Sequence, residues 1–259
     1  MRHLRHTVLA ALAVALYAAP VAAADKPHEN SGAAAVAPAR GGGLTGGELL
    51  GEDWARGLAR PSSPDPFSGG CRPFVGNVLT PAWVNGTATC TVARSSLLFV
   101  FFGSFCSDLD DPPLFKTEDQ LACAVAADQA IRAFSVTVDR RTIDIRTRRF
   151  ELFSPQRTAR LTAENFYGVP AGTPVTFTAH AWGAVIGKLH PGRHTVTIEV
   201  VAPDWGLDPL TLTINLTVVR GDGSDEDDDQ MYAAKARAQR AFQLQDRVPL
   251  DVREGHFSL

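Results

Sequence analysis

The residues best suited to bind a metal ion are three histidines, His180, His190 and His194. Imidazole nitrogens are preferred ligands of zinc and copper, and three of them brought together would form a site. A Pro-Gly turn sequence separates His190 from His194, however, and no regular spacing places a third ring beside them. We therefore interpret the three as turn and strand residues with backbone hydrogen bonds, and the sequence indicates no bound metal and no cofactor.

Two acidic clusters could bind calcium through carboxylate oxygens. One is the loop with Asp108, Asp110 and Asp111, and the other is the run over residues 222–229. Neither cluster matches the loop signature D-x-[DN]-x-[DN]-G, which places its ligands around a sharp turn. We therefore interpret the first cluster as a solvent-exposed loop and the second as an acidic tail.

Three carboxylates, Glu164, Asp204 and Asp208, are the candidates for acid–base catalysis. Hydrolysis of a glycosidic bond needs two such groups about 5–10 Å apart, a distance that sequence spacing does not supply. The chain also lacks the G-x-S-x-G motif of serine hydrolases. The sequence therefore predicts no catalytic residue, and a secreted polysaccharide hydrolase is the alternative function.

Aromatic side chains are the candidates for ligand binding. Trp182 and Trp205 lie near the ends of expected strands, and Tyr167 lies in a loop bounded by Gly and Pro. Exposed rings of this kind stack on sugars or anchor a protein partner, whereas burial in the core is the alternative. These three residues predict a glycan or an envelope protein as the partner.

The charge pattern argues against a nucleic-acid partner, because the formal net charge is -3. Five arginines do cluster between residues 140 and 149. They could face an anionic polymer or lipid, but solvent-facing positions around a hairpin are the simpler interpretation, since acidic residues elsewhere offset their charge.

The N-terminus has the features of a signal peptide. Arg2 and Arg5 precede an apolar run over residues 7–17, and small residues over 21–24 predict cleavage before Asp25. The apolar run is shorter than the roughly 20 residues that a membrane-spanning helix needs, and no later segment approaches that length. We expect a secreted or periplasmic protein without a membrane span.

Four cysteines, Cys71, Cys90, Cys106 and Cys123, remain after this cleavage. An even number in an exported chain indicates disulfides, and three pairings are possible. We favour Cys71 with Cys90 and Cys106 with Cys123, because neighbours in sequence close short loops.

Alternating side chains predict strands in the central region. Aliphatic and polar residues alternate without a break over residues 210–218, and the same alternation recurs over 134–139, 175–180 and 195–200. Residues 97–102 are apolar throughout, which suits a strand buried on both faces. Thr117 and Gln120 form a capping box before the alanine-rich residues 121–131, which predict a single helix that carries Cys123.

Composition divides the remainder of the chain. Residues 25–47 combine Ala, Gly, Pro and charge with almost no large apolar side chains, and this is typical of a flexible leader. Residues 221–259 form the acidic tail with a short helical segment. We therefore expect one domain over residues 48–220: mainly β, an antiparallel β-sandwich with one helix in a connection and two disulfides.

Residues 48–220 contain a series of motifs in a fixed order: Trp54, Pro64, Pro66, Gly70-Cys71, Trp83-Val84, Cys90-Thr91-Val92, residues 97–100, Cys106-Ser107, the helix with Cys123 and residues 191–195. This series resembles a family of small exported bacterial proteins of unknown function, which are described chiefly by their cysteines and strands. Residues 189–196 and the strand after them are also similar to the closing hairpin of immunoglobulin-like extracellular modules. Such modules are more often binders or spacers than enzymes, so the resemblance implies a non-enzymatic binding or structural role.

Overall fold

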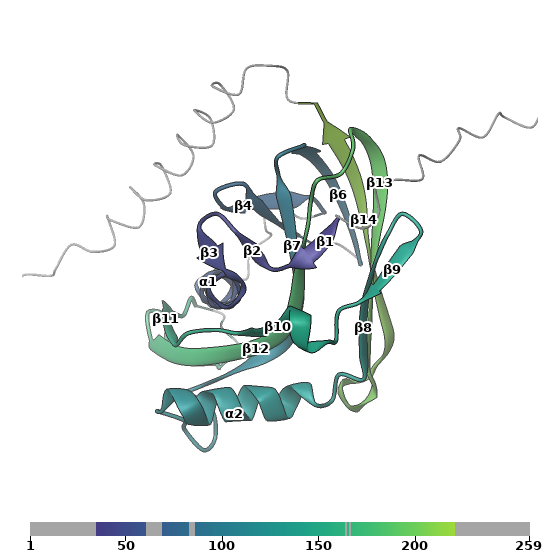
Figure 1. Ribbon diagram of the computed structural model, residues 1–259. Coiled ribbons are helices and arrows are strands. Elements are labelled where there is room, and N and C mark those ends of the chain that lie inside the picture. Colours follow the sequence, from purple (N-terminus) through teal and green to yellow (C-terminus); the bar gives the residue numbers. More distant parts are fainter. Residues whose placement is uncertain (1–34, 61–68, 83–85, 164, 166, 221–259) are drawn as a thin grey trace, which may run out of the picture.

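The computed structural model describes residues 35–60, 69–82, 86–163, 165 and 167–220, and the predicted signal peptide and acidic tail lie outside them. Strands form most of the regular structure, so the mainly β class is confirmed. The described part contains two large sheets, a two-stranded sheet, two α-helices and the short 3-10 helices η1 (Arg148–Phe150) and η2 (Pro203–Trp205). Figure 1 shows the large sheets side by side.

The first sheet is built around its longest strand, β12 (Pro174–Ile186). Its order is β1-β12-β7-β5-β4, and two short strands, β10 and β11, also pair with β12. All pairs are antiparallel except β5 with β7. The other strands are β1 (Val36–Pro38), β4 (Cys71–Val75), β5 (Val78–Pro81), β7 (Leu97–Ser107), β10 (Glu151–Phe153) and β11 (Arg157–Arg160).

The second sheet has the order β6-β14-β13-β8-β9. Its strands are β6 (Thr87–Ala93), β8 (Ala133–Val138), β9 (Arg141–Asp144), β13 (Gly192–Ala202) and β14 (Leu207–Val219). The predicted alternation is confirmed in β8, in β13 from Val196 onward and in β14 from Ile214 onward, where every second side chain is buried. The expected purely antiparallel arrangement is wrong, because β14 and β6 run parallel, as β5 and β7 do in the first sheet.

The larger hydrophobic core lies between the two sheets. Trp182, Ala184 and Ile186 of β12 pack there against the inner side chains of the second sheet. These inner side chains include Phe134, Val136, Val196, Ile198, Val200, Ile214 and Leu216. The opposite face of β12 presents Ala179, Ala181 and Val185, so β12 is buried on both faces rather than on one.

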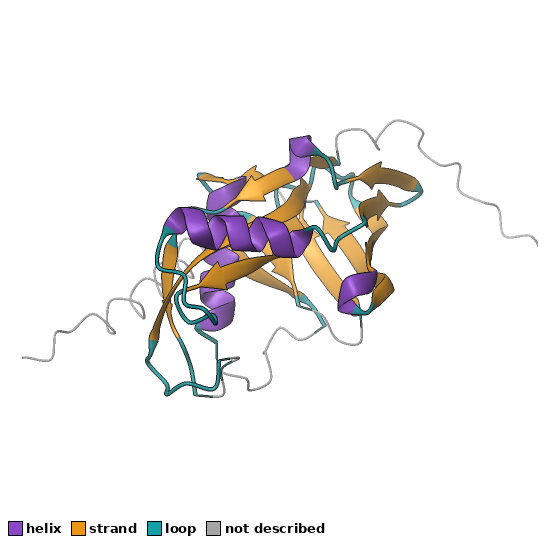
Figure 2. Ribbon diagram, turned by 90° about the horizontal axis from the view of Figure 1, so that it is seen from below, coloured by secondary structure: helices purple, strands orange, loops and turns teal. Residues whose placement is uncertain are grey.

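The helix α2 (Thr117–Asp128) confirms the predicted helix, and Figure 2 shows it lying across strands of the first sheet. The predicted capping box is wrong, because Lys116 is the N-cap residue and makes no side-chain cap. The side chain of Gln120 is instead buried, and its amide donates to the carbonyl oxygens of Leu114 and Thr176, 2.7 and 2.8 Å away.

A second helix, α1 (Gly46–Leu58), was not expected. Thr45 and Glu48 form its capping box, and two short strands precede it, β2 (Arg40–Gly41) and β3 (Leu44–Thr45). Leu49 and Leu50 are fully buried against the face of β12 opposite to α2 (Figure 1). The prediction of a flexible leader is therefore wrong for residues 35–47, because β1 pairs with β12 and the start of α1 packs on the first sheet.

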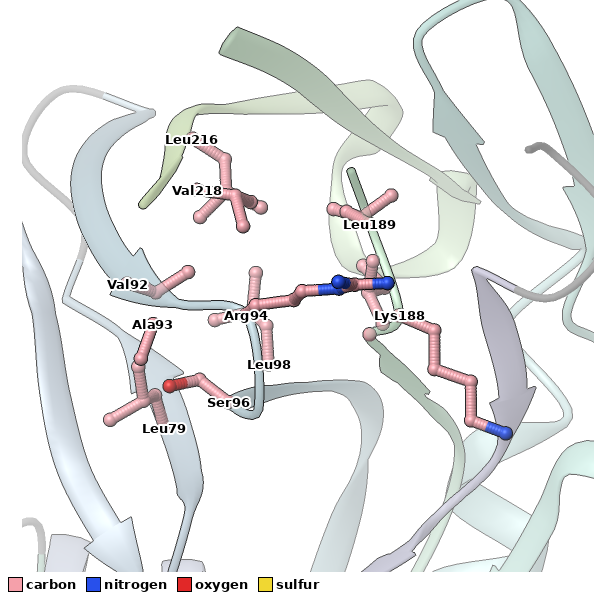
Figure 3. Close-up of a pocket in the computed structure, with 12 residues that line it drawn as sticks. Leu79, Val92, Ala93, Arg94, Ser96, Leu98, Lys188, Leu189, Leu216 and Val218 are labelled. Carbon is pink, nitrogen blue, oxygen red and sulfur yellow. The ribbon is translucent and has the colours of Figure 1, made fainter. Parts of the chain in front are cut away.

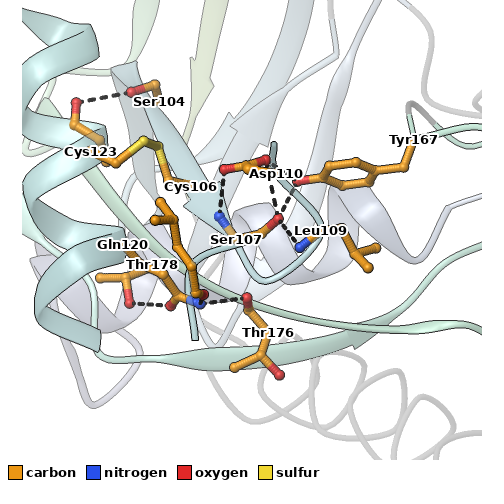
Figure 4. Close-up of a disulfide and its surroundings, with 12 residues drawn as sticks. Ser104, Cys106, Ser107, Leu109, Asp110, Gln120, Cys123, Tyr167, Thr176 and Thr178 are labelled. Atoms are coloured by element: carbon orange, nitrogen blue, oxygen red, sulfur yellow. Dashed lines mark hydrogen bonds between the residues drawn. A yellow bond between two sulfur atoms is a disulfide. The ribbon is translucent and has the colours of Figure 1, made fainter. Parts of the chain in front are cut away.

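Both disulfides form the favoured pairings, and each joins two different layers. Cys71 of β4 is bonded to Cys90 of β6, which connects the first sheet to the second. Cys106 of β7 is bonded to Cys123 of α2, which fastens the helix to the sheet, as the sequence led us to expect (Figure 4).

We expect the paired substitution C71S/C90S to lower the free energy of unfolding by about 3 kcal/mol, because the bridge closes a loop of 19 residues in the unfolded chain. The melting temperature should fall by roughly 2–4 °C per kcal/mol. Thermal unfolding under oxidising conditions measures the change, with the wild type in reductant as the control. Identical melting of wild type and variant would show that the bridge does not stabilise the fold.

Candidate functional site

A cavity of about 430 Å³ lies at the edge of the first sheet, where β5 separates from β7. In the described part of the chain these strands pair only through Val78 with Leu97 and Leu79 with Leu98. Successive side chains of a strand point to opposite faces, so beyond this point both faces of β7 contribute to the space that opens. Apolar side chains form most of its wall: Phe99, Val100, Phe101 and Phe102 of β7, Ile198 of β13 and Leu212 of β14.

The aromatic walls of the cavity are held by further rings. The ring centroids of Phe99 and Phe101 are 5.2 Å apart, and Trp54 of α1 lies 6.2 Å from Phe101. On the other face of β7, Trp205 lies 6.0 Å from Phe102. Since α1, β7 and η2 each supply a ring, the shape of the wall is fixed by packing and not by one mobile side chain.

A charged pair forms the polar part of the wall. The Nη2 atom of Arg72 on β4 lies 3.4 Å from Oδ1 of Asp53 on α1, and both side chains are nearly buried. The Nε atom of Arg72 donates to Oγ1 of Thr80 on β5 at 2.7 Å. Burial raises the pKa of Asp53 above its usual value, and the attraction of Arg72 offsets only part of this effect.

A smaller hollow lies among β6, β14, β7 and the end of β12, and Figure 3 shows it close up. Leu79, Leu98, Leu216 and Val218 line it together with Arg94. Its volume is about 10 Å³. A space of this size holds one water molecule at most, so the hollow is not a site for an organic ligand.

A second group of ionisable side chains is enclosed beneath the end of α2. His180 of β12 is fully buried, with Nδ1 2.6 Å from Oδ2 of Asp128 and Nε2 3.2 Å from Oε1 of Glu151. The imidazole can donate to both carboxylates only when it carries two protons. The rings of Trp182 and Phe153 flank it, with centroids 4.9 and 5.1 Å away. The carboxylates belong to α2 and β10, so this group ties both elements to β12.

The loop after β7 is held by another polar network, shown in Figure 4. The hydroxyl groups of Ser107 and Tyr167 lie 2.6 Å apart, and Asp110 Oδ2 accepts a hydrogen bond from the backbone N–H of Ser107. Burial raises the pKa of Tyr167 to about 12. Tyr167, predicted to bind a ligand, thus anchors its own loop to the end of β7.

The remaining predicted ligand-binding residues lie elsewhere. Trp182 is buried in the core between the sheets, with the guanidinium of Arg146 5.1 Å from its ring centroid. Trp205 is 38% exposed and packs beside Phe102 at the cavity. Both tryptophans therefore neighbour Phe102 of the cavity wall, Trp205 from the partly exposed side and Trp182 from within the core.

The two predicted acids that the structure describes are exposed and do not line the cavity. Asp204 is exposed and forms an ion pair with Arg132 at 3.3 Å, and Asp208 is exposed. Glu164 lies outside the described residues. In the acidic loop that we interpreted as solvent-exposed instead of calcium-binding, Asp108 Oδ1 accepts a hydrogen bond from the backbone N–H of Thr176, so this carboxylate serves the fold.

The histidines and cysteines do not form a metal site in the described part of the chain. His194 lies near Asp139 and the carbonyl oxygen of His190, whereas His180 is enclosed in the first sheet. The only cluster of three potential ligand atoms there is Cys106, Cys123 and Asp110, and its two sulfur atoms are already bonded to each other.

The outer face of the second sheet is polar and rich in hydroxyl groups. Its strand register aligns five threonines, one per strand: Thr87, Thr213, Thr197, Thr137 and Thr142. Threonine is a common residue on the solvent side of a strand. No aromatic residue interrupts this row, so the rings needed for ligand stacking lie at the cavity instead.

Sequence reasoning missed the residues of the cavity. Asp53 and Arg72 are separated by 19 positions and by the transition from a helix to a strand. One signal was present: Thr45 and Glu48 are a capping box, which predicts α1 and thereby places Asp53 and Trp54 on a helix.

Comparison of the chain with family models, curated proteins and solved structures finds no match. The resemblances noted in the sequence therefore stay predictions. No helix in the described residues has the length and apolar content that crossing a membrane requires.

We expect His180→Phe to lower the free energy of unfolding by about 1–3 kcal/mol, because it leaves the buried carboxyl group of Asp128 without its hydrogen-bond partner. Urea unfolding measures the loss, and His190→Gln, at an exposed position, is the control that should stay within about 0.5 kcal/mol of wild type. Adding Asp128→Asn to His180→Phe should recover part of the stability. A double variant with fully additive losses would show that the two side chains are not coupled.

Proposed function

We propose that this protein is an exported, non-enzymatic binding module whose ligand occupies the cavity between β5 and β7. The observation that carries this proposal is a cavity of about 430 Å³ with an aromatic and aliphatic wall and one charged pair. Ligand sites are typically concave and mostly apolar, with a few polar groups that orient the ligand, and their volumes are roughly 300–1,000 Å³.

The nature of the wall favours an apolar ligand over a glycan. Phe99, Phe101 and Phe102 present rings that are already packed against other rings, and Ile198 and Leu212 close the side toward the second sheet. Burying an apolar molecule here yields about 25 cal/mol per Å² of apolar area. Hydroxyl groups of a sugar would find few hydrogen-bond partners on such a wall.

The distribution of acids supports binding rather than hydrolysis. The described candidates Asp204 and Asp208 are exposed, and neither lines the cavity. The one carboxylate in the described cavity wall, Asp53, has a guanidinium as its neighbour instead of the second acid that glycoside hydrolysis needs. The polysaccharide hydrolase considered from the sequence therefore has no support in this geometry.

We also propose that the protein is exported and that its fold is an immunoglobulin-like sandwich. The signal-peptide features of residues 1–24 support export, and so do two disulfides of the kind that oxidising compartments maintain. Two packed sheets with a disulfide between them support a sandwich, in which the parallel pairs would be departures from the immunoglobulin pattern.

We expect Leu212→Trp to reduce the affinity for an uncharged apolar dye, Nile red, at least tenfold, because the larger side chain fills the cavity. Fluorescence titration of the dye measures this loss. The control is Thr211→Trp, which places the same side chain one residue away on the exposed outer face and should bind as wild type does. Equal affinity of Leu212→Trp and wild type, or no binding by wild type, would refute the proposed site.

A further inference from the structure

One end of the second sheet carries cations from adjacent strands. β6 and β14 are parallel and end side by side, with Ala93 opposite Val219, and β13 begins next to them, with Gly192 opposite Val218. Neighbouring strands lie about 4.7–4.9 Å apart, so these three positions are close together. The next residue on each strand is an exposed arginine: Arg94, Arg220 and Arg193.

Two connections add three more cations to this end. The turn between β8 and β9 lies beside the start of β13, because the backbone N–H of Asp139 donates to the carbonyl oxygen of Thr195. The connection from β12 to β13 lies there as well, since Lys188 and Arg94 line the same small hollow (Figure 3). All added cations are exposed. We call the whole set the basic end: Arg94, Arg140, Arg141, Lys188, Arg193 and Arg220.

Little negative charge opposes the basic end within the residues that the structure describes. None of its six cations forms an ion pair there. The carboxylate of Asp139 lies in the β8–β9 turn, but it is bonded to Nδ1 of His194 at 3.0 Å and to the backbone N–H of Thr195 at 3.1 Å. The six like charges therefore repel one another, and an anionic partner would relieve this repulsion.

The chain itself continues from the basic end into an anionic segment. The described part ends at Arg220, and six of the eight residues over 222–229 are acids. Eight extended residues reach roughly 26–29 Å, which exceeds the distance of about 19 Å between the first and last of five neighbouring strands. Because only Gly221 joins this segment to Arg220, its effective concentration at the basic end is on the order of millimolar.

We propose that residues 222–229 bind to the basic end of the same molecule and exclude other polyanions from it. Six acids then face six cations, so the two charges match. The individual pairs are exposed, so the contact depends on their number and weakens with salt. This inference is independent of the cavity, because no residue of the basic end lies in the described cavity wall.

Carbodiimide cross-linking of the full chain tests this contact, because it joins an amine to a carboxylate only where the two groups touch. Lys188 supplies the amine. The control is Lys116, which is exposed and precedes α2, whose Gln120 is bonded to Thr176 near the start of β12, whereas Lys188 follows the end of that strand. We expect links from residues 222–229 to Lys188 to be at least fivefold more abundant than links to Lys116 in 20 mM NaCl.

Peptide mass spectrometry counts the links, and mixing isotope-labelled with unlabelled chains identifies those between two molecules. The excess within one molecule should disappear in 0.5 M NaCl, because salt screens exposed charges. Equal yields at the two lysines, or an excess found only between molecules, would overturn this inference and leave the proposed binding function intact.

Two double variants with the same change of net charge test the cations. Arg94→Gln with Arg193→Gln should lower the yield of links to Lys188 at least threefold. Arg132→Gln with Arg160→Gln removes two exposed arginines near the opposite ends of β8 and β12, and it should leave the yield unchanged. Equal yields in the two double variants would contradict the role of the basic end.

A variant of residues 222–229 with every Asp changed to Asn and Glu226 to Gln tests the exclusion of other polyanions. It should bind dextran sulfate at least tenfold more tightly than wild type in 20 mM NaCl, because the internal competitor is lost. Adding the first double variant should abolish this gain, and adding the second should preserve it. If wild type binds the polymer as tightly as the neutral variant, or if neither binds, the basic end is not occupied by the acidic segment and the inference is wrong.

Discussion

The burial of β12 on both faces is the constraint on which the remainder of this structure depends. This strand pairs with β1, β10 and β11 along one edge and with β7 along the other. The small side chains of Ala179 and Ala181 leave room for α1 on this face, and a side chain added at Gly183 would meet Leu152 and Phe101. The polar residue His180 in the same strand has no access to water, so its two carboxylate partners must come from α2 and β10.

The cavity is a consequence of the way in which β4 and β5, at one side of the first sheet, are attached to their neighbours. The disulfide of Cys71 holds β4 against β6 of the second sheet, while β5 is tied to β7 by two residue pairs only. Between these attachments the strands diverge, and no described strand fills the space beside Phe99 to Phe102. The sheet thus opens at a place where its neighbours are covalently fixed, which keeps the space open instead of allowing collapse.

Local patterns in the sequence predicted local structure well. They did not predict contacts between residues that are far apart in the sequence. The alternation over β8, β13 and β14 gave the buried face of each strand, and the cysteine spacing gave both bridges. The alternation of β12 was misleading, because its polar residues Thr178 and His180 face α2 and not solvent. Gln120 looked like a cap and is a buried amide. Asp53 meets Arg72 only after a helix and a hairpin have folded, and no periodicity encodes that contact.

Two buried polar groups of this fold differ in the space beside them. Around His180, the short bond to Asp128 is enclosed by rings and by α2, so moving either side chain would leave a buried polar atom without its hydrogen-bond partner. The contact between Asp53 and Arg72 instead borders the cavity, and both side chains form part of its wall. A polar group that is enclosed on all sides serves the fold alone, whereas a polar group in a cavity wall is also within reach of a ligand. The space left where β5 separates from β7 is therefore what gives Asp53 and Arg72 a place in the proposed binding site.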